Sequence, residues 1–419
     1  MPHAIEVAAA CIFSLALIHT FAGKRIEALA TRYPAHAGLF HFLGEVEVVF
    51  GFWALVLCAV IWAVSGKAAV VDYLEAREFT EPAFVFVVMV IAASKPVLQA
   101  VTRLLLGVAK ILPLRAELVI VWLSLGVVPL LGSFITEPAA MTLAALLLRD
   151  RLFLLPVRES SKYSALAVLF VNVSIGGTLT AYAAPPVLMV ASAWGWNTAF
   201  MAATFGWKAA IAVVINATVL LIAIARQIPG GDSPSPESPE DEPIPVGVTL
   251  AHLFFLVFVV LNAHHAILFV AAFLFFLGFT QAYERYQSPL LLRESLLVAF
   301  FLSGLVVLGG LQQWWLQPVV RSMDAQVLYI GATGLTAIMD NAAITYLGSL
   351  IEGLSNEAKY LLVAGAVTGG GLTVIANAPN PAGLAIVRRG FSDKSVSALG
   401  LLASAILPTA TACVAFVLL

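Results

Sequence analysis

The sequence predicts an all-α polytopic membrane protein made of two inverted repeats. Of the 419 residues, 61% are hydrophobic and 11% are charged, whereas a soluble domain has about 45–50% apolar and about 25% charged residues. Apolar stretches of about twenty residues recur along the chain, which is the length of a membrane-spanning helix, and barrels show short alternating segments instead. The composition therefore excludes a soluble enzyme, and the length of the apolar stretches excludes a β-barrel.

About ten segments are predicted to span the membrane, because each is a long apolar window bounded by charged residues, glycine or proline. No basic segment precedes the first apolar run and no clear cleavage site follows it, so we expect a first span there rather than a leader. The predicted spans are residues 4–23, 43–64, 82–102, 163–193, 198–225, 246–261, 266–282, 290–311, 361–378 and 396–419.

Two further segments, 117–148 and 325–350, contain polar, glycine-containing breaks in the middle of an apolar run. The first break has the sequence LLGSFITEPAAMT and the second has the sequence GATGLTAIMDNAAIT. A helix that stops inside hydrocarbon must have its free backbone groups satisfied by protein. We therefore expect each segment to form a re-entrant helical hairpin whose tip lies inside the membrane.

Residues 230–245, with the sequence GGDSPSPESPEDEPIP, form the only strongly hydrophilic stretch. This composition cannot bury apolar surface, so we expect a flexible acidic linker. A solvated loop without a function of its own is the preferred interpretation. The linker divides the chain into an N-terminal repeat, 1–229, and a C-terminal repeat, 246–419.

The two halves resemble each other at three places in the same order. ITEPAAMT at 135–142 matches IMDNAAIT at 338–345, which aligns Glu137 with Asp340. Within the predicted broken helices, 163–193 and 361–381, GGTLTAYAAPP matches GGGLTVIANAP. A weaker match relates EVEVVFGFW at 45–53 to ESLLVAFFL at 294–302. Matches in a conserved order indicate an internal duplication.

The positive charges predict the orientation, provided that both hairpins return to the side they entered from. Most Lys and Arg residues of the loops then share one side with the linker, which makes that side cytoplasmic by the positive-inside rule. Both termini would be non-cytoplasmic, and the two hairpins would open to opposite sides, as inverted repeats require. We expect a multi-pass protein of the cell (inner) membrane.

Few ionisable residues lie deep in the predicted spans, and each is a functional hypothesis because burying a charge in hydrocarbon is costly. Glu137 and Asp340 are the strongest candidates, since each lies at a helix break that frees carbonyl oxygens and helix ends. Hydroxyl and amide oxygens accompany both acids, and hard oxygen ligands suit small hard cations such as Na+. The hairpins supply Ser133, Thr136, Thr142, Thr336, Asn341 and Thr345, and the broken helices supply Thr178, Thr180, Thr373, Asn377 and Asn380.

A buried carboxylate also binds protons, so a proton and a cation compete for the same group. This competition, together with alternating access, is sufficient for cation/proton exchange. The structural alternative is that Glu137 or Asp340 only caps a hairpin helix, which the cost of burying an acid disfavours. Gly and Pro in the broken helices could serve packing alone, but their repetition in both halves favours a binding role.

Lys95 also lies inside a predicted span and needs a charge partner, which Glu45, Glu47 or Glu137 could provide. Two interpretations are equally supported: a built-in cation that leaves when sodium arrives, or a structural ion pair. Glu45 and Glu47 lie two residues apart and cannot share a helix face, so one of them is expected near the membrane interface or a subunit contact.

Other functions lack sequence support. The chain has neither the ligand spacing of a transition-metal site nor a nucleophile motif or Walker loop. The net charge of −2 gives no basic surface for nucleic acid. We expect no enzyme activity and no cofactor, with the lipid bilayer and small cations as partners.

The motifs GSFITEPAAMT, VNVSIGGTLTAYAAPPVL, MDNAAITYLGS and VTGGGLTVIANAPNPAG resemble those of a sodium/proton antiporter family in the ion transporter superfamily. That superfamily includes NhaD-type antiporters, arsenite permeases and divalent-anion and citrate symporters. The resemblance covers both hairpins and both broken helices. It implies two inverted repeats, each with a re-entrant hairpin and a broken helix, in a homodimer with an elevator-like motion.

The hairpin tips depart from the superfamily's usual Ser-Asn-Thr or Asn-Asn-x-Pro-Thr motif. Here the tips read Thr136-Glu137-Pro138 and Asp340-Asn341-Ala342, so each tip has an acid, which disfavours a dianionic substrate. We therefore expect a secondary active transporter that exchanges sodium, or another small monovalent cation, for protons at the two tips. Sodium-coupled symport of a small carboxylate or another anion is the alternative, and paired helix breaks fit a channel less well.

Overall fold

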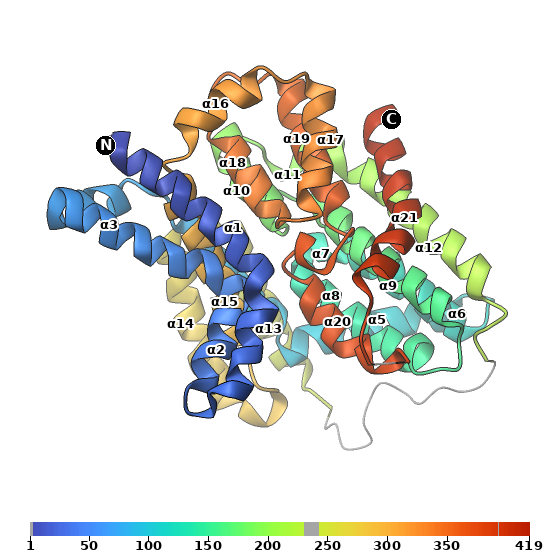
Figure 1. Cartoon of the computed structure of the whole chain (residues 1–419). Coiled ribbons are helices and arrows are strands. Elements are labelled where there is room, and N and C mark those ends of the chain that lie inside the picture. Colours follow the sequence, from blue (N-terminus) through green and yellow to red (C-terminus); the bar gives the residue numbers. More distant parts are fainter. Residues whose placement is uncertain (1–2, 230–242, 393) are drawn as a thin grey trace.

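A computed structural model describes residues 3–229, 243–392 and 394–419, and every regular element in these ranges is a helix. Most of the predicted linker lies outside the described residues. The helices form two groups that lie side by side (Figure 1). The first group comprises α1 (His3–Arg32), α2 (Ala37–Gly44), α3 (Val46–Glu75), α4 (Thr80–Ala92), α13 (Val246–Leu261), α14 (Ala266–Ala282) and α15 (Leu292–Gly309).

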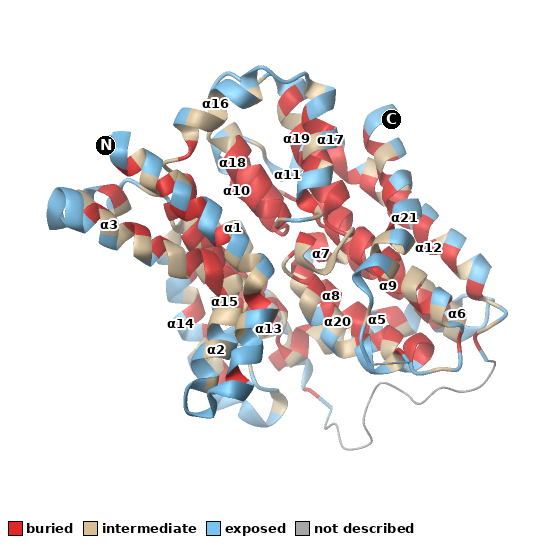
Figure 2. Ribbon diagram, viewed as in Figure 1, coloured by how far each residue is buried: buried red, intermediate tan, exposed pale blue. Residues whose placement is uncertain are grey.

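The second group contains the predicted hairpins and broken helices. Its most enclosed long helix is α9, and Figure 2 shows buried residues along α9, α10 and α18, whereas the outer helices expose apolar faces. The group comprises α6 (Ala116–Leu125), α7 (Val127–Ile135), α8 (Glu137–Leu148), α9 (Glu159–Gly176), α10 (Pro185–Trp194), α11 (Thr198–Met201), α12 (Trp207–Ile224), α17 (Ala325–Thr336), α18 (Asn341–Ser349), α19 (Asn356–Gly369), α20 (Asn380–Val387) and α21 (Ala398–Leu418).

Two amphipathic helices, α5 (Lys95–Ile111) and α16 (Gln313–Arg321), lead from the first group into the second. Each follows the last helix of its half in the first group and precedes the hairpin segment of the same half. They lie on opposite sides of the molecule, α16 at the top and α5 at the bottom of Figure 1. On α5, Val97, Leu105 and Ala109 are buried, whereas Arg103 and Lys110 are exposed.

Six described helices are long and apolar enough to cross a membrane, or eight if each of two bent helix pairs counts as one span. Shorter apolar helices, α10, α13 and α14, stand beside them. These lengths and compositions identify a multi-pass helical membrane protein. The number of about ten spans stays a prediction, because the shorter helices would also have to cross.

The structure differs from the prediction of one span at 82–102. The chain bends by 62° between α4 and α5, and Ser94 at the bend has an extended backbone (φ −67°, ψ 147°). Pro96 is the physical cause, because proline fits the first turn of a new helix but cannot continue the preceding one. The other bent pair, α6 and α7, turns by 46° at Gly126.

The first group is held together by a close crossing of α3 and α15. A side chain on Gly304 would collide with the backbone of Phe50 and Gly51, and one on Gly51 would collide with the ring of Phe300. Small residues let membrane helices approach closely, where van der Waals packing replaces the hydrophobic effect. The rings of Phe50 and Phe301 pack edge to face beside the crossing, with centroids 5.2 Å apart.

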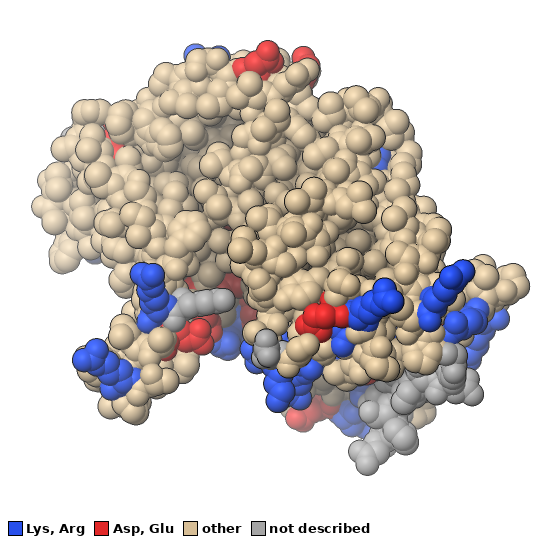
Figure 3. Space-filling view, turned by 45° about the vertical axis from the view of Figure 1, so that its right-hand side comes forward, with Lys and Arg blue, Asp and Glu red and all other residues tan. Residues whose placement is uncertain are grey.

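Lys and Arg atoms gather along the lower edge of the molecule in Figure 3, and the rest of the visible surface is largely uncharged. The chain ends marked in Figure 1 both lie on the upper side. On this face Lys and Arg are therefore unevenly distributed, and the chain ends marked in Figure 1 lie toward the edge that is poorer in them.

The crossing generates a stability prediction. Gly304→Ala should lower the thermal unfolding midpoint of the detergent-purified protein, because overpacking costs about 1–3 kcal/mol and exceeds the gain of about 1 kcal/mol in helix propensity. Gly278→Ala on α14 is the matched control, since a side chain there meets no atom within 4 Å. Equal midpoints for the two variants would contradict the close crossing.

Candidate functional site

The first hairpin tip is a single residue wide. α7 ends at Ile135 and α8 begins at Glu137, and the residue between them, Thr136, has φ 73° and ψ 151°. This backbone region is almost restricted to glycine and costs about 1–3 kcal/mol for other residues. Pro138 in the first turn of α8 suits a helix start. The strained turn allows α8 to begin directly at the acid.

Glu137 at this tip is fully buried. Its Oε2 accepts a hydrogen bond of 2.9 Å from Nδ2 of Asn377, whereas Oε1 has no hydrogen-bond partner in the described part of the chain. The carboxylate has room because residue 177 is glycine: a Cβ there would lie 2.5 Å from Oε1. One carboxylate oxygen is therefore available to a ligand or a proton.

The second tip is wider and is built around Asp340. α17 ends at Thr336 and α18 begins at Asn341, and Oδ1 of Asp340 accepts a hydrogen bond of 2.8 Å from the amide of Ala342. Asp340 is thus an N-cap, as the structural alternative supposes, and is 8% exposed. Backbone amides of Ala343 and Ala378 also interact with this carboxylate. Nδ2 of Asn341 donates to Oγ of Ser174 at 3.3 Å.

Both predicted broken helices are interrupted at their Gly-rich motifs. α9 ends at Gly176 and α10 begins at Pro185, while α19 ends at Gly369 and α20 begins at Asn380. A 3-10 turn occupies part of each gap, Gly177–Leu179 in the first and Val374–Ala376 in the second. These gaps place irregular backbone next to the tips, which a membrane tolerates only inside the protein.

Each predicted hairpin contacts the interrupted helix of the other half of the chain. Glu137 is bonded to Asn377 of the C-terminal half, and Asn341 is bonded to Ser174 of the N-terminal half. The helices that follow the tips pack in the same way, α8 against α20 and α18 against α10. The two tips are therefore held at the contact between the halves.

Most hydroxyl groups of the predicted site are used to stabilise the breaks. Oγ of Ser133 donates to the carbonyl of Gly176 at 2.7 Å and accepts from the amide of Leu179 at 2.9 Å. The remaining predicted hydroxyls with a backbone partner each donate to a nearby carbonyl: Thr178 to Ile175, Thr180 to Ser133, Thr336 to Ala332, Thr345 to Ala342 and Thr373 to Ala337. Thr142 is half-buried on α8.

In the described ranges, five buried oxygens without a hydrogen-bond partner lie at three of the four breaks: the two tips and the interruption between α19 and α20. More than about 90% of buried polar groups in proteins are paired, so each exception needs an explanation. A small hard cation requires such free oxygens, from carboxylates, amides and hydroxyls. At the breaks they are Thr136 Oγ1, Glu137 Oε1, Asn341 Oδ1, Asn377 Oδ1 and Asn380 Oδ1, whereas others among the described residues, such as those of Gln287, Ser295 and Thr409, lie elsewhere.

The charged residues predicted around Lys95 are divided among different places. Lys95 is half-buried at the start of α5, directly after the bend. Glu45 forms an ion pair with Arg293 of α15. Glu47 lies in the first turn of α3 and borders a small cavity together with Asp340.

The sequence did not predict that Ser174 and Glu47 lie near the second tip. Ser174 bonds Asn341, and it belongs to the motif VNVSIGG, where a polar residue follows each valine. That local excess of polar residues in a buried helix was the available signal. Glu47 was considered only as a partner for Lys95, and no local pattern places it at the second tip.

The bond between Glu137 and Asn377 generates a testable prediction. Asn377→Ala and Glu137→Gln should show an interaction free energy of about 0.5–3 kcal/mol in a double-mutant cycle of unfolding in detergent, because contacting residues are not additive. Asn216→Ala is the control, since Asn216 is bonded to Asn172 and to the carbonyl of Pro408 instead. Additive effects of Glu137→Gln and Asn377→Ala would show that this bond does not join the halves.

Comparison with known proteins assigns the family. No curated protein matches the chain. The model of the family described as "Putative Na+/H+ antiporter" matches residues 4–419, which include both tips and both interrupted helices. The chain therefore belongs to this Na+/H+ antiporter family.

Proposed function

We propose that this protein exchanges sodium, or another small monovalent cation, for protons by alternating access at a site near the middle of the membrane. The site comprises Glu137, Asp340 and the oxygens at the four helix breaks. The observation that carries the proposal is the set of unpartnered buried oxygens around the two tips. Family membership supports cation/proton antiport independently.

The chemistry requires no cofactor. A carboxylate in a dry interior is stable only when it is protonated or paired with a cation. Oε1 of Glu137 has no hydrogen-bond partner, so either species would occupy the same oxygen. Binding of Na+ would release the proton, and binding of the proton would release Na+. An enzyme mechanism is not part of the proposal.

The packing of the helices supports an inverted repeat of residues 1–229 and 246–419. If α1, α3, α4 and α5 correspond to α13, α14, α15 and α16, then the contact of α1 with α3 corresponds to that of α13 with α14. The same correspondence turns the contact of α3 with α15 into the contact of α14 with α4, and both contacts are present. A two-fold axis in the membrane plane requires such pairs of contacts. This correspondence pairs α3 with α14, whereas the weaker sequence match of 45–53 with 294–302 pairs α3 with α15.

The two helix groups suggest how access alternates. The tips and interrupted helices belong to the second group, and α5 and α16 join it to the first from opposite sides of the molecule. We infer that the second group moves relative to the first and carries the bound ion with it. The homodimer implied by the family resemblance stays a prediction.

The uneven distribution of Lys and Arg in Figure 3 supports a cytoplasmic position for the edge that bears them. Both termini, which lie on the other side in Figure 1, would then be non-cytoplasmic. The proposed location is the cell membrane, which is the inner membrane in a cell that has two.

A transport assay tests the exchange. In acid-loaded proteoliposomes that contain an internal pH dye, external Na+ should raise the internal pH, because each entering cation drives protons out. Glu137→Gln and Asp340→Asn should each reduce the rate by at least about tenfold, which corresponds to about 1.4 kcal/mol. Glu6→Gln, an exposed residue bonded to His3, serves as the control.

Two outcomes of this assay would contradict the proposal. If Glu137→Gln and Asp340→Asn both show the wild-type rise in internal pH, the two tips are not required for exchange. Sodium-dependent uptake of a labelled dicarboxylate, without a pH change, would replace antiport by anion symport.

Alternating access predicts that linking the two helix groups stops transport. Oη of Tyr346 on α18 donates to the carbonyl of Val306 on α15 at 3.1 Å. In a protein with its three cysteines replaced, Val306→Cys and Tyr346→Cys should be bridged by a short bifunctional reagent that forms a disulfide with each thiol, and exchange should stop until these disulfides are reduced. Each single cysteine variant treated with the same reagent is the control. Normal exchange in fully linked protein would exclude relative motion of α15 and α18.

A further inference from the structure

A small cavity lies at the boundary between the two helix groups, beside the second tip. Its volume is about 20 Å³, and a space of about 10–15 Å³ is sufficient for one water molecule. Glu47 on α3 and Phe301 on α15 line it from the first group, and Asp340 and Asn377 line it from the second. The cavity has room for one water or one dehydrated monovalent cation.

Asn377 connects this cavity to the first tip. Its Nδ2 donates a hydrogen bond to Oε2 of Glu137. The other polar atom of the amide, Oδ1, takes no part in that bond. Asn377 is only 1% exposed, and Oδ1 has no hydrogen-bond partner in the described ranges. A buried amide oxygen at a cavity with two carboxylates is an unused cation ligand.

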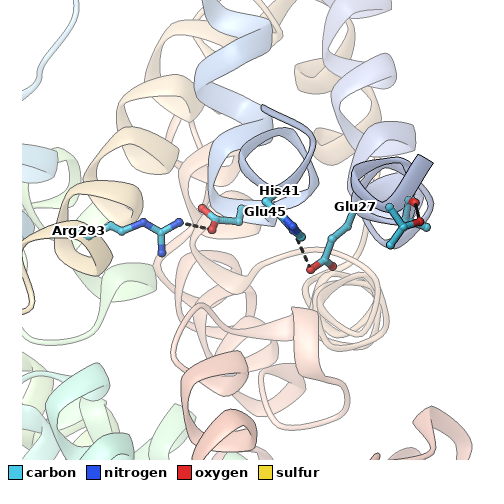
Figure 4. Close-up of polar contacts among 6 residues, drawn as sticks. Glu27, His41, Glu45 and Arg293 are labelled. Carbon is cyan, nitrogen blue, oxygen red and sulfur yellow. Dashed lines mark hydrogen bonds and ion pairs between the residues drawn. The ribbon is translucent and has the colours of Figure 1, made fainter. Parts of the chain in front are cut away.

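The charges around Glu47 favour a cation in the cavity. The charged groups that act on Glu47 are Glu45, Arg293 of α15 and Asp340. Figure 4 shows that Arg293 points to Glu45 and forms an ion pair with it. Glu47 and Asp340 therefore bring two carboxylates to one cavity, where a cation would offset their like charges.

We propose that Glu47 binds a single Na+ or Li+ ion together with Asp340 and Asn377, and thereby supplies a cation ligand from the first helix group. This inference rests on the proposed antiport and adds a residue from outside the hairpins and broken helices. The bound ion would contact both groups in this conformation, and Glu47 would release it when the second group moves. When the ion leaves, one proton would take its place on the pair of Glu47 and Asp340.

Two measurements on one set of variants test the role of Glu47. The first is the concentration of Na+ that gives half-maximal exchange in proteoliposomes, and the second is the rise in unfolding midpoint that Na+ produces in detergent. Glu47→Gln should raise the half-maximal concentration at least about tenfold and diminish the Na+-dependent rise. Glu6→Gln is the control, because Glu6 is bonded to His3 and does not line this cavity, and it should behave as wild type.

The outcomes separate this inference from the proposed function. If wild-type protein exchanges neither Na+ nor Li+ for protons, the proposed function fails. If wild-type protein does exchange them and Glu47→Gln matches the Glu6→Gln control in both measurements, the inference is overturned and the antiport stands. Should Glu47→Gln not fold, Glu47→Asp decides: an intermediate half-maximal concentration supports the role of Glu47, and a wild-type value contradicts it.

Discussion

The buried carboxylate of Glu137 is the constraint on which the rest of the site depends. One oxygen is held by Asn377 across the contact between the halves, and the other has no hydrogen-bond partner in the described residues. A charge in such a dry interior is stable only with a cation or as the protonated acid. The strained Thr136, the glycine at 177 and the interrupted α19–α20 segment are the features that bring the acid to this position.

Interrupting four segments inside a membrane leaves backbone groups without helical partners, and the protein must satisfy them itself. Ser133, Thr180 and Thr373 do this by bonding carbonyls at the breaks, and Nδ2 of Asn380 bonds the carbonyls of Gly370 and Thr373. The donor hydrogens of these side chains thus satisfy backbone carbonyls. The amide oxygens of Asn377 and Asn380 and Oε1 of Glu137 have no hydrogen-bond partner in the described residues. This division gives a rigid site lined by acceptors, which suits a cation.

The sequence predicted the breaks well because acids, Gly and Pro are rare in long apolar runs and therefore conspicuous. Asp340 and Glu137 were found in this way, as were Asn377 and Asn380. The bend at Ser94 was missed, although Pro96 signals it, because the window 82–102 is apolar on both sides of the proline. The exchange of partners between halves, α8 with α20 and α18 with α10, depends on tertiary packing that no local pattern encodes. The position of Glu47 beside Asp340 depends on tertiary packing in the same way.

Competition between a proton and a cation for Glu137 is the central claim, and proton release measures it most directly. Na+ is added to the detergent-purified protein in weakly buffered solution while the pH is followed. Competition predicts that wild-type protein releases protons in proportion to the Na+ bound and that Glu137→Gln releases fewer. Na+ binding without proton release, or equal release from Glu137→Gln, would contradict it.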